Sequence, residues 1–246
     1  MKKYFYIVFL FLFLIPLGIA DTLKVAIDPS YPPFALANED ETYDGFEVDV
    51  AKALAKDLNM DIKFFNLEYP AALVSLTTNK ADLIVTVDKS DLKEGKVFFS
   101  SPVMSSGYSV IVNSSNKVIK NREDLRGKKI GGIQGTQAID AITRLYPDFN
   151  IIYFDSADVM YESLAQNKID AVVNDSVVND YYVKNSPRSS KVKTLIPEFD
   201  SANGFMAISI KREKLYNDIE SSLKKLEKNG TMKSIREKWS FKAPLQ

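Results

Sequence analysis

Polar residues directly follow three of the β-rich runs in this sequence of 246 residues. They are Asp28 after Leu23–Ile27, Gln134-Gly135-Thr136 after Lys129–Ile133, and Asn174-Asp175 after Ala171–Val173. In open α/β sheets, ligand-binding groups lie at the carboxyl ends of the strands. We therefore expect these residues to face a common gap, where carboxylates hold a positive charge and backbone amides hold a negative one.

Each of these positions also has a structural interpretation. An acid just past apolar β-formers is costly to bury alone, and a bound cation would supply the partner that Asp175 needs. Asp175 could instead cap a helix that begins at Ser176, and Asp28 could be a turn residue before Pro29. Gly135 lets the backbone approach a ligand closely, and Thr136 can bind a ligand as well as cap the following helix.

Composition excludes several classes of chemistry. Histidine and cysteine are both absent, which removes Ser-His-Asp and Cys-His nucleophile systems and zinc or iron–sulfur sites built on these ligands. An enzyme would have to use carboxylates, lysine, tyrosine or serine. The formal net charge of +0 gives no electrostatic footprint for nucleic acid, and no nucleotide-binding glycine motif occurs. We expect no cofactor, no metal and no nucleic-acid partner.

Short β-rich runs alternate with helical patterns along the chain. The clearest helix is Phe46–Leu58, where Phe46, Val50 and Leu54 recur at helical spacing and Glu47 lies off that apolar stripe. Strands are also expected at 62–65, 82–87 and 151–154, and helices at 71–78, 136–146, 158–166 and 215–228. This alternation predicts an α/β fold with parallel sheets that are covered by helices on both faces.

The alternation pauses at two extended runs, near Tyr108–Val112 and near Asp200–Ile210. If both runs cross between domains, the chain leaves a first lobe, builds a second one and returns. We therefore predict lobe 1 at residues 21–112, lobe 2 at 113–200 and a return segment to lobe 1 at 201–246. The ligand site would lie between the lobes.

Residues 1–20 have the pattern of a secretory signal peptide. Lys2 and Lys3 precede an apolar run that ends with Pro16, Gly18 and Ala20. An uncleaved anchor is the alternative, because the run could almost span a bilayer. We expect cleavage after Ala20 and a periplasmic or extracellular protein, and the absence of cysteine excludes a lipid-anchored lipoprotein.

The chain resembles the family 3 extracellular solute-binding proteins, the amino-acid receptors of ABC importers. The similarity begins at Pro32-Pro33-Phe34 and Gly45–Val50, and it continues through the segments 99–102, 124–128, 134–136, 170–175 and 229–239. It implies a two-lobed type II periplasmic-binding-protein fold, hinged on two crossover strands, that closes on a small solute and presents it to a permease.

The resemblance also implies roles for individual residues. Asp175, with Asn174 beside it, matches the main acceptor for the ligand's ammonium group, and Asp28 helps to hold that group. Tyr31 and Tyr69 match positions where aromatic rings contact the ligand's side chain. Gly135 and Thr136 match the segment that binds the ligand's carboxylate at the start of a helix.

The sequence departs from the family at the carboxylate-binding arginine. Lys93 occupies that position, and lysine offers a point charge in place of two parallel hydrogen bonds. Thr86 and Asp88 fall where the family has small and hydroxyl residues that contact the carboxylate, and an acid at Asp88 would repel that group. These changes favour a cationic or zwitterionic ligand over an acidic one.

The resulting interpretation is a monomeric, non-catalytic receptor that captures an amino acid or related amine for an ABC-type permease. An exported enzyme on the same scaffold, resembling cyclohexadienyl dehydratase, is an alternative, since Asp175, Asp28 or Lys93 could supply a proton. A stand-alone solute sensor that signals through a separate membrane protein is another.

Overall fold

The computed structural model describes residues 21–93, 95–133 and 136–246. The predicted signal peptide therefore lies outside the described residues, and so does Gly135. Within these three ranges, no helix has the length and apolar character needed to cross a membrane.

An 8-stranded sheet runs through both lobes of the described structure, in the order β4-β1-β5-β10-β6-β9-β7-β8. At one end lie the parallel strands β1 (Thr22–Ile27), β4 (Asp61–Asn66) and β5 (Leu83–Val87). At the other end lie the parallel strands β7 (Lys129–Ile133), β8 (Asn150–Phe154) and β9 (Ala171–Asp175). Each parallel group forms the centre of one lobe.

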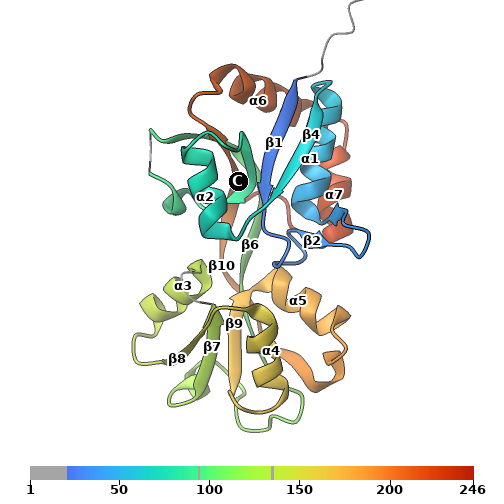
Figure 1. Ribbon diagram of the computed structural model, residues 1–246. Helices are drawn as coiled ribbons and strands as arrows, with labels where there is room; N and C mark the ends of the chain where they lie inside the picture. Colours follow the sequence, from blue (N-terminus) through green and yellow to red (C-terminus); the bar gives the residue numbers. More distant parts are fainter. Residues whose placement is uncertain (1–20, 94, 134–135) are drawn as a thin grey trace, which may run out of the picture.

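Two long strands join the lobes, β6 (Val97–Asn113) and β10 (Val192–Ser209). They pair antiparallel to each other; β10 also pairs with β5 in lobe 1, and β6 also pairs with β9 in lobe 2. Figure 1 shows them crossing between the upper and lower parts of the molecule. Gly107 allows their close approach, because a Cβ atom there would lie 2.5 Å from the carbonyl oxygen of Phe199.

Helices cover each parallel group, as the figure also shows. Lobe 1 carries α1 (Phe46–Asp57), α2 (Tyr69–Thr77), α6 (Glu213–Lys228) and α7 (Thr231–Trp239). Lobe 2 carries α3 (Gln137–Leu145), α4 (Ala157–Ala165) and α5 (Ser176–Asn185). A hairpin of β2 (Leu36–Ala37) and β3 (Tyr43–Asp44) precedes α1, and the 3-10 turns η1 (Lys89–Asp91), η2 (Glu123–Leu125) and η3 (Ser189–Lys191) lie in connections.

The sequence patterns predict the short parallel strands well and the crossing strands only in part. The extended runs near 108–112 and 204–210 are fragments of strands that extend over 97–113 and 192–209. Polar residues such as Ser105 and Ser106 interrupt the apolar pattern there. The helical patterns also leave out α7, and α5 is offered only as an alternative interpretation at Ser176. The two-lobed α/β architecture with two crossover strands is confirmed.

Candidate functional site

Asp175 and Asn174 meet Tyr31 of the other lobe. Both lobe 2 residues end β9, and Tyr31 lies in the connection that follows β1. The hydroxyl of Tyr31 lies 2.7 Å from Oδ1 of Asn174 and 2.6 Å from Oδ2 of Asp175. Residues that are more than a hundred positions apart in the chain therefore form a direct bridge between the lobes.

The geometry separates the two interpretations of Asp175. It occupies the N-cap position of α5, but its side chain accepts no hydrogen bond from the helix. Its carboxylate contacts Tyr31 instead, and no lysine or arginine of the described residues forms an ion pair with it. Burial raises the pKa of Asp175 to about 6, and the Tyr31 hydrogen bond opposes part of this rise.

This bridge contains too few protons when Asp175 is ionised. A hydroxyl carries one proton, so Tyr31 can donate to Asn174 or to Asp175 but not to both. A protonated Asp175 would satisfy both contacts by donating to Tyr31, which would then donate to Asn174. An ammonium group could supply the missing donors equally well.

A hydrogen-bond network within lobe 2 holds the side chain of Asn174. Asn174 is fully buried, and its amide nitrogen donates to the hydroxyl of Tyr161 at 3.1 Å. Tyr161 donates in turn to the buried side chain of Asn179, which donates to Ser109 of β6. Such a satisfied buried network fixes the direction of the Asn174 side chain. The end of β9 is thus preorganised, while Asp175 has its partner only across the lobe boundary.

Lobe 1 positions Asp28 very differently. One oxygen of Asp28 accepts from the amide and the hydroxyl of Ser30, at 3.0 and 2.6 Å. The other accepts from the amide of Tyr69 at 3.0 Å, at the start of α2. Asp28 therefore forms the turn that the sequence offers as an alternative, and it also joins the end of β1 to α2. Its ligand-binding role stays a prediction.

A second bridge between the lobes runs through Asp91. Gln137 lies at the start of α3. Its side-chain amide nitrogen donates to Oδ1 of Asp91 at 3.1 Å and to the hydroxyl of Ser90 at 2.8 Å. Tyr69 donates its hydroxyl to Oδ2 of Asp91 at 2.6 Å. Asp88 caps the same turn by accepting from the amide and hydroxyl of Ser90. Sequence reasoning did not single out Asp91 or Gln137, because their meeting depends on how the lobes face each other.

Thr86 lies beside a buried carboxylate that sequence reasoning also missed. Glu47, in the first turn of α1, is only 6% exposed. Burial raises its pKa to about 8, while hydrogen bonding from Thr86 lowers it and the nearby charge of Asp28 raises it. The hydroxyl of Thr86 is buried and has no hydrogen-bond partner of standard geometry among the described residues.

The remaining predicted residues lie apart from these bridges or outside the described ranges. Lys93 is exposed, and no hydrogen bond or ion pair of its side chain is found within the described residues. Thr136 occupies the N-cap position of α3, but its hydroxyl donates back to the carbonyl of Ile133 at 2.9 Å. The residues of the two bridges and their neighbours form the lobe junction: Asp28, Tyr31, Tyr69, Asp88, Asp91, Gln137, Asn174 and Asp175.

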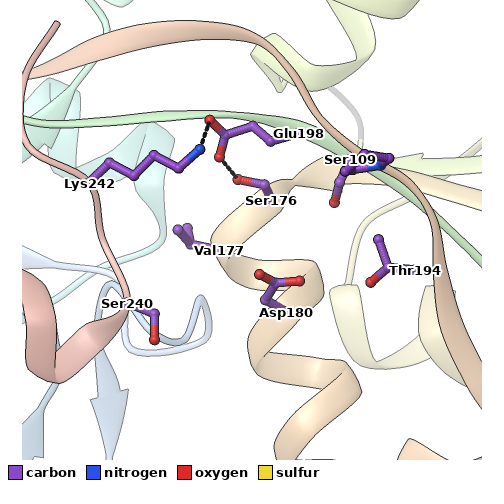
Figure 2. Close-up of a pocket in the computed structure, with 9 residues that line it drawn as sticks. Ser109, Ser176, Val177, Asp180, Thr194, Glu198, Ser240 and Lys242 are labelled. Atoms are coloured by element: carbon purple, nitrogen blue, oxygen red, sulfur yellow. Dashed lines mark hydrogen bonds and ion pairs between the residues drawn. The ribbon is translucent and has the colours of Figure 1, made fainter.

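A hollow of about 160 Å³ lies next to the crossing strands rather than within the lobe junction. Figure 2 shows Glu198 of β10 in this hollow, between Lys242 of the C-terminal segment and Ser176 of α5. Glu198 pairs with Lys242 at 2.6 Å and accepts from the Ser176 hydroxyl at 2.5 Å. Because Ser176 directly follows Asp175, this ion pair supports the start of α5 from behind.

Two lobes on two crossing strands, with polar side chains from both lobes in contact at the strand ends, define a solute-binding protein of the two-lobed α/β class. The chain belongs to the bacterial extracellular solute-binding proteins, family 3, whose profile matches residues 23–243.

Individual relatives of known sequence or structure are also amino-acid-binding proteins. The chain is 28% identical over 220 residues to the L-cystine-binding protein TcyJ of Escherichia coli (strain K12), covering 89% of this chain and 82% of TcyJ. It is similar to the solved structure of an ancestral arginine-binding protein bound to arginine, with 30% identity, a TM-score of 0.78, and 90% and 99% of the two chains covered. It is also similar to the ancestral amino acid-binding protein AncCDT-1, a precursor of cyclohexadienyl dehydratase, with 30% identity, a TM-score of 0.77, and coverage of 89% and 95%.

Proposed function

We propose that this protein is an exported receptor that captures a cationic or zwitterionic amino acid, or a related amine, between its lobes and delivers it to an ABC-type permease. Asp175 accepts the ligand's ammonium group, with Asn174 beside it. The Tyr31 and Tyr69 rings contact the rest of the ligand. The protein acts as a monomer without catalysis, outside the cytoplasmic membrane.

The observation that carries this proposal is the Asp175 carboxylate, whose side-chain partner among the described residues comes from the opposite lobe. It is the N-cap residue of α5 but does not cap it, and its described hydrogen-bond partner is a hydroxyl that Asn174 also needs. A primary ammonium group has three donors and a positive charge, so it would satisfy Asp175 and Asn174 together.

Ligand entry requires the lobes to separate. The Tyr31–Asp175 and Gln137–Asp91 contacts would open, and the movement would be taken up in β6 and β10. A ligand that contacts both lobes then stabilises the closed form through its differential affinity for that form. We place the lobe boundaries near residues 112 and 200, within these strands.

The test is a thermal-shift and calorimetry screen of amino acids, polyamines and small organic acids against the protein and its Asp175→Asn variant. We expect a basic or neutral amino acid or an amine to raise the melting temperature, because a ligand at a hundred times its Kd adds about 2.7 kcal/mol of stability. Asp175→Asn should abolish that shift while melting at least as high as the parent without ligand. Asp61→Asn, an exposed acid at the start of β4, is the matched control.

Two results would contradict the proposal. A ligand shift that survives in Asp175→Asn would remove Asp175 from the site. Binding of acidic solutes alone would exclude the charge complementarity on which the proposal depends. AncCDT-1 is itself an amino acid-binding protein and only a precursor of cyclohexadienyl dehydratase, so the similarity to it does not favour the dehydratase alternative. Incubation with prephenate or arogenate tests that alternative directly, since product formation would establish catalysis.

A further inference from the structure

Residues 240–246, which follow α7, form a strap that contacts both lobes. Phe241 anchors the strap in lobe 1: it is only 6% exposed, and its ring centroid lies 4.9 Å from that of Phe34 and 4.3 Å from that of Phe46. The next residue, Lys242, pairs instead with Glu198 of β10 at 2.6 Å. Adjacent side chains of the strap therefore reach opposite lobes.

The main chain of the strap is fixed to both crossing strands. Ser105 of β6 donates its amide to the carbonyl of Lys242 at 3.2 Å and its hydroxyl to the carbonyl of Ala243 at 2.6 Å. Asn203 of β10, which pairs with Ser105, binds both the amide and the carbonyl of Leu245. The backbone at Lys242 is therefore held at one level of the two strands.

The Lys242–Glu198 ion pair spans the irregular part of these strands. The pairing of β10 with β6 shifts register between Phe199 and Ala202; Glu198 lies on the lobe 2 side of this shift, and the strap is attached on the lobe 1 side. Bulged strands bend, so movement of the lobes would change the separation of the two charges. Among the ion pairs of the described residues, this is the one that joins a lobe 1 segment to a lobe 2 residue.

The Glu198 carboxylate collects donors from three segments. Its side chain is 15% exposed, and it accepts from Lys242, from Ser201 at 2.7 Å and from Ser176 at 2.5 Å. Burial opposes its ionisation, but the hydrogen bonds from Lys242, Ser176 and Ser201 outweigh burial and lower the pKa of Glu198. Figure 2 shows the carboxylate between Lys242 and Ser176. Because Ser176 directly follows Asp175, the strap is connected to the residue that lies across from Tyr31.

This contact is stronger than an ordinary surface ion pair. The Lys242 side chain is 61% exposed, and pairs in which both charges are exposed contribute little. Here the carboxylate is mostly covered, so removal of Lys242 leaves a covered charge with neutral hydroxyl partners. Open and closed lobes are close in free energy in proteins of this kind, so a modest contact present in one arrangement shifts the populations.

We infer that the Lys242–Glu198 ion pair holds the lobes in the closed arrangement, and that both are positioning residues, which act on Asp175 through Ser176. The structure contains this ion pair together with the two inter-lobe bridges, from Tyr31 to Asp175 and from Gln137 to Asp91. Loss of the ion pair should therefore favour the open arrangement. The inference goes beyond the proposed function, because it concerns the free protein and holds for any solute.

Distances between spin labels on the two lobes test this inference. The sequence has no cysteine, so Lys56→Cys in α1 and Tyr153→Cys in β8 place one label at an exposed position of each lobe. Double electron–electron resonance on the mature chain, refolded to remove any retained solute, measures the populations of short and long distances. We expect Lys242→Met to lower the ratio of closed to open molecules about fivefold, and Lys242→Arg to preserve it. Lys238→Met is the matched control, since Lys238 is similarly exposed and pairs with Asp49 within lobe 1.

A double-mutant cycle separates positioning from general destabilisation. Glu198→Gln should open the lobes as much as Lys242→Met does, and the two changes together should add nothing further. Additive effects, the same opening in Lys238→Met, or a lower melting temperature with unchanged distances would each overturn the inference. The proposed function is tested separately, because a solute screen without a ligand would contradict the receptor and leave these distances as they are.

Discussion

Asp28 and Asp175 occupy equivalent places in the two lobes, yet their surroundings differ. Asp28 directly follows β1 and Asp175 is the last residue of β9, and each lies close to the start of a helix. Asp28 accepts three hydrogen bonds from its own lobe, from two donors of Ser30 and from the amide of Tyr69. Within the described residues, the Asp175 side chain accepts one, from Tyr31 in the opposite lobe.

The difference shows which acid depends on a ligand. Asp28 is satisfied within lobe 1 whether the lobes are open or closed, so its carboxylate acts first as a structural link. Asp175 loses its described partner when the lobes separate, and burial raises its pKa to about 6. A buried carboxylate that lacks a hydrogen-bond donor from its own lobe gains more from a cation than a carboxylate with three local donors.

Glu47 is the exception that tests this contrast most strongly. It belongs to lobe 1, but burial raises its pKa from 4.5 to about 8. The folded state therefore holds the Glu47 proton more tightly than the unfolded state does. Unfolding free energy should fall as pH rises from about 4.5 to about 8, because the unfolded chain releases this proton first.

Replacing Glu47 with glutamine should accordingly stabilise the free protein by about 3 kcal/mol at pH 8. The gain should shrink towards pH 5, where the carboxyl group is neutral in the folded state. Urea unfolding of both proteins at pH 5, 6.5 and 8 measures the difference. A stabilisation that does not change with pH would mean that ionisation of buried Glu47 does not lower the free energy of unfolding. A destabilised variant would mean that the Glu47 carboxylate has a favourable partner in the folded protein.

Asp28→Ala should do the reverse and destabilise the protein by about 2 kcal/mol, because three donors lose their acceptor. Ligand affinity should fall by less than tenfold. Asp175→Ala should show the opposite profile, with little loss of stability and no binding. The same urea and calorimetric titrations compare the two variants. An Asp28→Ala variant of unchanged stability that no longer binds would place Asp28 in direct contact with the ligand and remove the contrast.

The residues at the strand ends could be predicted from the sequence because apolar β-runs are local features, and the carboxyl ends of parallel strands meet by geometry. The bridge from Gln137 to Asp91 could not, since it depends on the angle between the lobes. Glu47 lies off the apolar stripe of α1, and helical periodicity predicts the face of a helix but not how deeply its first turn is covered. Lys93 matches the family's arginine by its position in the sequence, and sequence position does not give the direction of a side chain.

Ligand affinity should rise about tenfold between pH 5 and pH 7, because Asp175 with a pKa of about 6 passes from mostly protonated to mostly ionised over that range. The amine or amino acid stays cationic throughout, so the change reports the receptor. Calorimetric Kd values at half-unit intervals give the midpoint. A flat profile would mean either that Asp175 is already ionised at pH 5 or that it does not hold the ligand.

Tyr31→Phe produces the smallest expected effect and the most specific one. The hydrogen bond from Tyr31 lowers the pKa of Asp175, so its removal should move the midpoint of the binding profile upward by about half a unit to one unit. Tyr153→Phe is the matched control, since Tyr153 is 55% exposed on the edge strand β8. A midpoint that moves downward, or that moves equally in both variants, would show that the inter-lobe bridge does not set the ionisation of Asp175. The ionisation of Asp175 would then be set within lobe 2 alone.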